Sequence, residues 1–189
     1  MNIVLIGMSG SGKSTFGSFL SNLMNMPLID IDGEICKKYG DISTIFETAG
    51  EKIFRDFEEH EIMLASKTDN SVIATGGGAI LNPNNMKALK QNGLIVYLYA
   101  DIEYLFNKLK DANDRPLLSA QTDEIKKQKL EQIFLSRSEK YLQYADIVLN
   151  VSGILESRNL LDEQIEKQLG ALYIEFLNSF EKKVYKKFD

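Results

Sequence analysis

The 189-residue sequence has few residues of the kinds that act alone as reactive groups, with one cysteine, Cys36, and one histidine, His60. A single cysteine cannot form a disulfide within the chain, so the core has to stabilise the fold, which fits a reducing compartment. Neither residue stands in a motif typical of a nucleophile. We interpret Cys36 as a small half-buried side chain, with a nucleophile as the alternative, and we assign His60 no role.

The sequence also lacks a run of about 18 consecutive apolar residues, which a transmembrane helix requires. Its first residues have no basic region and too short an apolar run for a signal peptide. The net charge is −5, from 22 Lys and Arg against 27 Asp and Glu, and no dense basic run typical of nucleic-acid binders is present. We therefore expect a cytoplasmic protein that binds neither nucleic acid nor a membrane and that acts as a monomer.

Short apolar runs alternate with helical periodicity along most of the sequence. The apolar runs predict strands at residues 2–6, 27–32, 71–75, 94–99 and 146–151. Apolar residues at helical spacing predict helices at residues 13–25, 34–39, 42–48, 51–67, 83–91, 102–110 and 124–143. This alternation predicts an α/β fold in which a five-stranded parallel sheet carries helices on both faces.

The length corresponds to about one domain, and no linker rich in Gly, Ser or Pro divides the chain, so we predict a single domain over residues 1–189. The polar segment 111–124 is expected to be a loop. Residues 154–189 carry a helical apolar stripe, which we expect to be interrupted near Gly170. We expect the tail from about 170 to 189 to pack back on the domain as an amphipathic helix. Its aromatic residues are Tyr173, Phe176, Phe180, Tyr185 and Phe188.

The strand at 2–6 leads into Gly7–Ser14 (GMSGSGKS), which matches the phosphate-binding pattern G-x-x-x-x-G-K-[ST]. Gly10 and Gly12 allow a tight turn whose N–H groups can bind an anion, and the following helix adds the positive end of its dipole. Lys13 would bind the β- and γ-phosphates of ATP, and Ser14 offers a hydroxyl to Mg²⁺. The motif predicts a sheet of the P-loop NTPase type that binds a nucleoside triphosphate, but it does not name the acceptor.

Two aspartates, Asp30 and Asp32, end the second predicted strand. Side chains at i and i+2 point the same way in a strand, so both carboxylates would face the phosphate loop, at a high desolvation cost without cationic company. Mg²⁺ and a polar acceptor would supply that company. One carboxylate would then lie near the metal and the other on the acceptor hydroxyl. The alternative is a solvated strand end, or an N-cap for the helix at Glu34.

Arg55 and Glu58 lie three residues apart inside a predicted helix, on one face. Their spacing alone favours a surface ion pair, and an arginine fork on a substrate carboxylate is the functional alternative. Gly76, Gly77 and Gly78 end the third strand. Because three consecutive glycines cost backbone entropy, we expect another molecule to approach the backbone closely there, with an irregular loop as the alternative.

Two further arginines follow the fourth strand. Arg115 stands in the polar loop, in the segment Arg115–Leu118 (RPLL). A loop with an arginine in a P-loop kinase indicates a lid that excludes water and places positive charge on the phosphates. Arg137 faces Tyr141 at i+4 in the long helix that follows, and by itself this spacing indicates a surface residue.

Taken together, these residues resemble the shikimate kinase family. The resemblance runs from about residue 3 to residue 150, in the family's order and at similar spacings. The phosphate loop is generic, whereas the combination of Phe-Arg-x-x-Glu, Gly-Gly-Gly and Arg-Pro-Leu-Leu is specific. The segments that carry the resemblance are Gly7–Thr15, Asp30 with Asp32, Phe54 and Arg55 with Glu58, Thr75–Gly78, Arg115–Leu118, and Arg137 with Tyr141, Ala145 and Asp146.

The resemblance implies that the chain phosphorylates the 3-hydroxyl of shikimate with Mg²⁺ and ATP, giving shikimate 3-phosphate and ADP in aromatic amino acid biosynthesis. It implies that Lys13, Asp32 and Arg115 act in catalysis, with Asp32 a candidate base. The residues it implies for ATP are Gly10, Ser11, Gly12, Lys13, Ser14, Thr15 and Arg115. Those for shikimate are Asp32, Arg55, Gly76, Gly77, Gly78 and Arg137, with Phe46 and Phe54 as pocket walls. Those for the metal are Ser14 directly and Asp30 through water.

The sequence departs from the family's pattern in two places. The family usually has a polar or basic residue and a proline after the last strand, near the adenine, where this sequence has Val151–Ile154 (VSGI). We therefore assign no adenine contacts. The chain also continues past the family's usual final helix, into the tail described above.

Other functions compete with this interpretation. The loop Gly7–Ser14 also resembles that of gluconate kinases, and nucleoside monophosphate kinases share the fold and a lid. Neither accounts for Arg55, the three glycines and the RPLL segment together. A non-catalytic ATP-binding regulator would be expected to have lost Asp32 or Arg115, both of which are present, or to carry a DNA-binding domain, for which the chain has no room.

Overall fold

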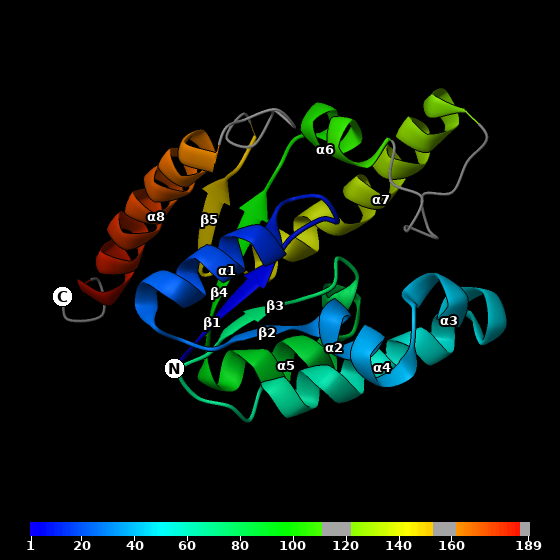
Figure 1. Cartoon of the computed structure of the whole chain (residues 1–189), viewed down its shortest axis with the longest axis horizontal. Coiled ribbons are helices and arrows are strands. Elements are labelled where there is room, and N and C mark those ends of the chain that lie inside the picture. Colours follow the sequence, from blue (N-terminus) through cyan, green and yellow to red (C-terminus); the bar gives the residue numbers. More distant parts are fainter. Residues whose placement is uncertain (111–121, 153–161, 186–189) are drawn as a thin grey trace.

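The computed structural model describes residues 1–110, 122–152 and 162–185. Its centre is a five-stranded sheet in the order β2-β3-β1-β4-β5, in which every neighbouring pair is parallel (Figure 1). The strands are β1 (Asn2–Ile6), β2 (Leu28–Asp30), β3 (Val72–Ala74), β4 (Gly93–Tyr99) and β5 (Ile147–Asn150). The predicted parallel α/β sheet is confirmed.

Helices cover both faces of this sheet (Figure 1). The first face is covered by α1, which contacts β1, β2 and β3, and by α8, which contacts β5 and α1. On the other face α5 and α7 contact β4, and α4 packs on α5 and α2. The helices are α1 (Lys13–Met24), α2 (Ile31–Tyr39), α3 (Ile42–Thr48), α4 (Gly50–Ala65), α5 (Pro83–Asn92), α6 (Ile102–Leu109), α7 (Asp123–Tyr144) and α8 (Asp162–Tyr185), with a 3-10 turn η1 (Ala79–Leu81).

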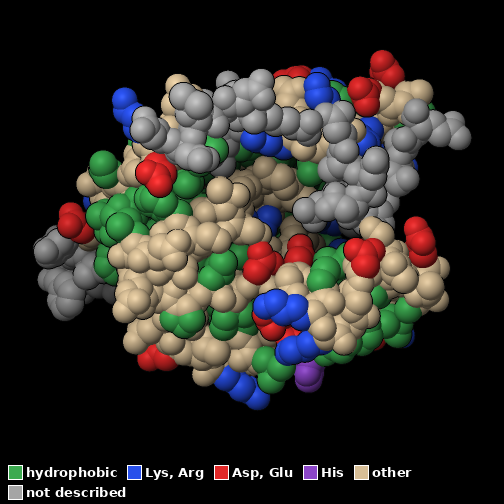
Figure 2. Space-filling view, viewed as in Figure 1, with side chains coloured by type: hydrophobic (Ala, Val, Ile, Leu, Met, Phe, Trp, Pro, Cys, Tyr) green, Lys and Arg blue, Asp and Glu red, His purple; other side chains and the backbone are tan. Residues whose placement is uncertain are grey.

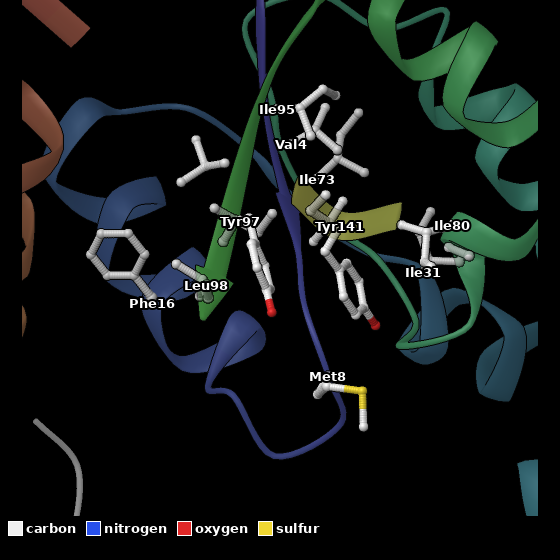
Figure 3. Packing of buried hydrophobic residues seen from close by; sticks show 14 of the residues in the cluster. Val4, Met8, Phe16, Ile31, Ile73, Ile80, Ile95, Tyr97, Leu98 and Tyr141 are labelled. Atoms are coloured by element: carbon white, nitrogen blue, oxygen red, sulfur yellow. The ribbon is translucent and has the colours of Figure 1, made fainter. Parts of the chain in front are cut away.

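The core lies between the sheet and its helices. Every residue of β1 is buried, as are the middle residues of β4, because a strand covered on both faces has no solvent side. Figure 3 shows Val4, Ile73 and Ile95 side by side on neighbouring strands, with Phe16 of α1 on the opposite side of the sheet from Tyr141. The core therefore holds the carboxyl ends of the strands at one edge, where ligands of such sheets bind.

The second strand is shorter than its pattern predicts. It ends at Asp30, and α2 begins at Ile31, so Asp32 lies in the first turn of a helix. The expectation that Asp30 and Asp32 extend from one side of a strand is wrong. Asp30 instead N-caps α2, its Oδ1 accepting a hydrogen bond from the Gly33 N–H at 3.2 Å, as the N-cap alternative anticipated.

The C-terminal helix also differs from its prediction, since α8 runs through Gly170 without interruption. Its apolar stripe packs on the domain as expected, with Leu169, Leu172 and Phe176 buried. At the far end, the Lys183 ammonium pairs with Asp146, which precedes β5. Phe188 and the side chain of Tyr185 lie outside what the structure describes.

The two rare residues lie away from any reactive cluster. Cys36 is exposed rather than half-buried, because it stands on the outer side of α2, and His60 is exposed on α4. Over the described ranges, no helix combines the length and apolar composition needed to cross a membrane.

Candidate active site

The loop between β1 and α1 has the backbone geometry of a phosphate cradle. Gly10 and Gly12 adopt φ values of 85° and 84°, which other residues rarely reach, and Gly12 caps the start of α1. Lys13 is buried, and its ammonium donates to the carbonyls of Gly7 at 2.9 Å and Met8 at 2.8 Å. The loop thus brings a helix N-terminus and a positive charge together, as binding of phosphate groups requires.

The side chains of this loop divide between interior and solvent. The hydroxyl of Ser11 is fully buried and has no hydrogen-bond partner among the described residues. Ser11 would therefore contact a phosphate through its backbone rather than through its side chain. Ser14 and Thr15 are exposed in the first turn of α1, where their hydroxyls can reach a ligand.

The three glycines after β3 leave room for side chains of this chain itself. A Cβ on Gly78 would lie within 2.5 Å of the Arg55 guanidinium carbon. A Cβ on Gly76 would lie 2.5 Å from Glu58 Oε1 and 2.8 Å from Asp32 Oδ1. Protein side chains occupy the space that a Cβ on Gly76 or Gly78 would need, so these glycines allow Asp32, Arg55 and Glu58 to approach the backbone closely.

Gly77 joins this cluster to the phosphate loop, since a Cβ there would lie 3.0 Å from both the backbone nitrogen and the hydroxyl of Ser9. Its carbonyl accepts two hydrogen bonds from α7, from Arg137 Nη1 at 3.1 Å and from the Tyr141 hydroxyl at 2.5 Å. Arg137 is buried, so the expectation of a surface residue, which its spacing alone gave, is wrong. Only packing on the glycine segment reveals its burial.

Arg55 is held by two carboxylates of its own helix. Its Nη1 donates to Glu58 Oε2 at 2.8 Å, and its Nη2 donates to Glu51 Oε1 at 3.0 Å. Glu58 is only 1% exposed, whereas the Arg55 side chain is 22% exposed and can still meet a ligand. The pair is therefore partly buried, which spacing alone did not indicate. The i,i+4 spacing of Glu51 and Arg55 could have revealed the second carboxylate, which our sequence analysis missed.

The environment of Glu58 favours its neutral form. Burial raises the pKa of this carboxyl above its ordinary value, and the negative charge of Asp32 raises it further, while Arg55 and Arg137 act in the opposite direction. Glu58 Oε1 has no hydrogen-bond partner among the described residues. Burial therefore favours the neutral form of Glu58, and the two arginines favour its ionised form.

Two stacked tyrosines lie beside Arg137. Tyr97 of β4 stacks on Tyr141 with ring centres 4.8 Å apart, and Figure 3 shows both hydroxyls directed toward the loop that carries Met8. Burial raises the pKa of Tyr97 to about 12 and also raises that of Tyr141, so both hydroxyls remain neutral. Tyr97 lies far from Tyr141 along the chain, and no sequence motif indicated that it belongs to the site.

The two proposed pocket walls lie next to Arg55. The rings of Phe46 and Phe54 meet at a centre-to-centre distance of 4.8 Å, and the Arg55 guanidinium lies 5.1 Å from the centre of Phe54. This arrangement restricts the guanidinium to one side of α4, next to Gly78. Apolar rings beside a charged group are typical of a pocket that binds a small polar molecule.

The structure thus brings two sets of predicted residues together. Asp32, Arg55 and Arg137 surround the Gly76–Gly78 segment, which itself lies against the phosphate loop. Figure 2 shows a hollow on this face of the molecule, with basic and acidic side chains around it. Arg115 and most of the predicted lid fall outside the described residues. The end of α6 lies near the phosphate loop, because Leu109 is 3.1 Å from the position of a Cβ on Gly10.

The donors available for a metal are few. Within the described residues no three His, Cys, Asp or Glu side chains form a cluster that could hold an ion. In kinases Mg²⁺ is bound mainly by phosphate oxygens and water, with few protein ligands. Ser14 and Asp30 are the residues present that suit this role, although one oxygen of Asp30 already caps α2.

Comparison with known proteins agrees with this geometry. A strand, a phosphate loop and a helix at the centre of a parallel sheet define a fold of the P-loop NTPase type. The sequence matches the model of the shikimate kinase family over residues 9–172. The chain belongs to the shikimate kinase family.

Two curated relatives illustrate the match. A shikimate kinase from Caldicellulosiruptor bescii is 49% identical over 118 residues, which span 62% of this chain and 69% of that protein. A shikimate kinase from Nitrosomonas europaea is 41% identical over 167 residues, covering 88% of this chain and 77% of that protein.

Solved structures show the same likeness in three dimensions. The shikimate kinase from Acinetobacter baumannii in complex with shikimate superposes with a TM-score of 0.77 at 32% identity, over 94% of this chain and 93% of that one. A gluconokinase from Sinorhizobium meliloti reaches a TM-score of only 0.52 at 16% identity, over 96% of each chain, and shares the fold alone.

Proposed function

We propose that the chain transfers the γ-phosphoryl group of ATP to the 3-hydroxyl of shikimate, giving shikimate 3-phosphate and ADP, in aromatic amino acid biosynthesis. The observation that carries this proposal is the meeting of Asp32, Arg55 and Arg137 at the Gly76–Gly78 segment, directly against the phosphate loop. Carboxylate-binding and hydroxyl-binding groups thus lie beside the site of the nucleotide. An acceptor that carries both groups fits this arrangement.

In this proposal Arg55 and Arg137 bind the carboxylate of shikimate. The two arginines come from different helices, α4 and α7, so a carboxylate between them would be fixed in orientation. The exposed Glu51 would give up its place on Arg55 to the substrate, whereas the buried Glu58 would keep Arg55 in position. An analogue without the carboxylate would leave both arginines unpaired and would bind poorly.

The phosphoryl transfer itself requires mostly positioning and charge stabilisation. The acceptor oxygen forms a bond to the γ-phosphorus while the bond from that phosphorus to the β–γ bridging oxygen breaks. Asp32 would orient the attacking hydroxyl and accept its proton. Lys13 and Arg115 would stabilise the negative charge on the phosphates. Mg²⁺, held by Ser14 and through water by Asp30, would neutralise charge on the same oxygens.

The remaining expectations are part of the same proposal. We infer that residues 1–189 act as a single kinase domain with a lid at about 111–124, and that the protein works as a monomer in the cytoplasm. The contacts of α8 with α1 and β5 support one continuous domain over the described residues.

The decisive experiment measures ADP release from Mg·ATP with shikimate, and in parallel with gluconate and with nucleoside monophosphates. We expect turnover with shikimate alone. Lys13→Ala is the control, and it should abolish turnover with every acceptor, because it removes the charge on the β- and γ-phosphates. Turnover with gluconate or a nucleotide, and none with shikimate, would leave the fold in place and overturn the acceptor.

A further inference from the structure

Glu61 is a second buried carboxylate on α4, one turn beyond Glu58, and the phosphoryl transfer described above does not use it. Its side chain is only 3% exposed. Both of its oxygens are bound by α2. Oε2 accepts a hydrogen bond from the Lys38 ammonium at 2.5 Å, and Oε1 accepts one from the Tyr39 hydroxyl at 3.0 Å. Because a buried carboxylate without partners is costly, these two contacts tie α2 firmly to α4.

The contacts lie at the end of α2 opposite to its aspartates. Asp32 stands in the first turn of α2, and Lys38 and Tyr39 stand in the last. The helix has nine residues and is therefore a stiff rod of about 13 Å. The Tyr39 ring also stacks on Phe57 of α4, at 4.0 Å between ring centres and 3° between planes. Fixing the last turn of this rod fixes the position of Asp32 in its first turn.

On α4, Glu61 lies close along the helix to the residues of the acceptor site. Arg55, Glu58 and Glu61 follow one another at intervals of three residues, so each is the neighbour of the next on the helix surface. The middle residue, Glu58, meets Asp32 beside Gly76. The first of these three residues binds the acceptor's carboxylate in our proposal, and the last residue binds α2.

We propose that Glu61 is a positioning residue of the acceptor site. By clamping Lys38 and Tyr39, it holds Asp32 at the separation from Arg55 that one shikimate molecule spans with its hydroxyl and carboxylate ends. This inference rests on the proposed function, because it assigns the clamp to the binding of that acceptor. ATP binds the loop between β1 and α1, which the clamp does not contact.

The test compares KM values for shikimate and for Mg·ATP in the full-length protein. In Glu61→Gln we expect the KM for shikimate to rise about tenfold, since small displacements of binding groups weaken an oriented site. The KM for Mg·ATP should rise less than the KM for shikimate, since the phosphate loop is unchanged and only the water-mediated contact of Asp30, the N-cap of α2, would be disturbed. Tyr39→Phe, which keeps the ring stack and removes only the hydroxyl, should give a smaller change in the same direction.

Two controls separate positioning from simple stabilisation. Lys37→Met removes a neighbouring ion pair, between Lys37 and Glu34, that lies within α2 alone and should leave both KM values unchanged. Adding Lys38→Met to Glu61→Gln should raise the KM for shikimate little further, because both changes break one contact.

The outcomes are distinct. An unchanged KM for shikimate in folded Glu61→Gln and Tyr39→Phe proteins would overturn the inference, even if their Tm values fell, because Glu61 would then only stabilise the fold. Equal increases in both KM values would overturn it as well. A wild-type protein that turns over no shikimate would overturn the proposed function itself, and the inference with it.

Discussion

At the scale of single residues, Glu58 shows how a site can depend on one ion pair. Its carboxyl is buried beside Asp32, and its hydrogen bond from Arg55 is the main contact that favours the ionised form. Breaking a buried pair leaves an uncompensated charge, which costs far more than the loss of a surface pair. In our proposal Arg55 therefore has two roles, to meet the acceptor and to favour the ionised form of Glu58.

We expect Arg55→Ala to lower the free energy of unfolding by about 3 kcal/mol at pH 7.5, because Glu58 loses its partner. Without Arg55 the pKa of Glu58 rises further above its ordinary value of 4.5. A carboxyl with a raised folded pKa contributes stability that is present at low pH and lost as the pH rises through that pKa. The difference in Tm between wild type and variant should therefore shrink as the pH falls from 7.5 toward 5 in thermal melts.

Binding experiments on this variant test its other role. Calorimetric titration should show nearly intact ATP binding and no measurable shikimate binding, since Arg55 lies on the acceptor side only. Arg55→Lys is the matched control, and it should restore part of the stability but little of the affinity, because lysine lacks the planar fork. Unchanged shikimate affinity in Arg55→Ala, or a Tm difference independent of pH, would contradict this assignment.

At the scale of elements, the Gly76–Gly78 segment is where four parts of the fold meet. The first turn of α2, the middle of α4, the phosphate loop and α7 all reach it through side chains or hydrogen bonds. Because no side chain projects from the segment, these elements approach one another more closely than any other residue would allow. The glycines therefore set the distances within the acceptor site.

We predict that Gly78→Ala raises the KM for shikimate by at least about tenfold, because its Cβ would displace the Arg55 guanidinium from a position within 2.5 Å. The cost in stability should be about 1–3 kcal/mol, as for other overpacked sites. Steady-state kinetics and thermal melts measure the two effects.

The control is Gly170→Ala in α8, where a Cβ would meet nothing within 4 Å. That change should leave the kinetics unchanged and stabilise the helix by up to about 1 kcal/mol. Wild-type kinetics in Gly78→Ala would show that Arg55 is not fixed by this contact.

At the scale of the whole molecule, α8 closes one face of the sheet far from the acceptor site. Phe176 is 2% exposed, and Tyr173 meets the ring of Phe19 on α1 edge to face, at 6.4 Å. The ammonium of Lys183 pairs with Asp146, whose other oxygen accepts from the N–H of Ile95 in β4. The helix thus joins the edge strand β5 to the rest of the core.

Phe176→Ala should therefore lower the free energy of unfolding by about 3 kcal/mol, the usual cost of a large cavity. The KM for shikimate should not change, because Phe176 lies on the face of the sheet opposite to α4 and α7. Ile174→Ala is the control and should have little effect, because Ile174 in the same helix is 61% exposed. Denaturant unfolding measures both, and equal stabilities of the two variants would show that α8 does not pack as described.

The sequence by itself determined the order of elements and the phosphate loop. Both depend on local patterns. The spacing of apolar residues gives the order of strands and helices, and the glycines that can adopt positive φ give the loop. Motifs in the family's order likewise pointed to the acceptor residues before any distance was known. Local pattern also gave α8 an apolar stripe that packs on the domain, although it wrongly suggested an interruption at Gly170.

Only the tertiary structure decided what surrounds each of these residues. Spacing along the chain placed Arg137 at the surface and Asp32 in a strand. In the folded chain Arg137 is buried and donates a hydrogen bond to the carbonyl of Gly77, 60 residues away, and α2 begins before Asp32. The clamp of Glu61 on α2 joins residues 22 and 23 positions apart, which no local pattern reports. The physical reason is that burial and partnership arise where elements pack together, and packing is a property of the folded chain rather than of any one segment.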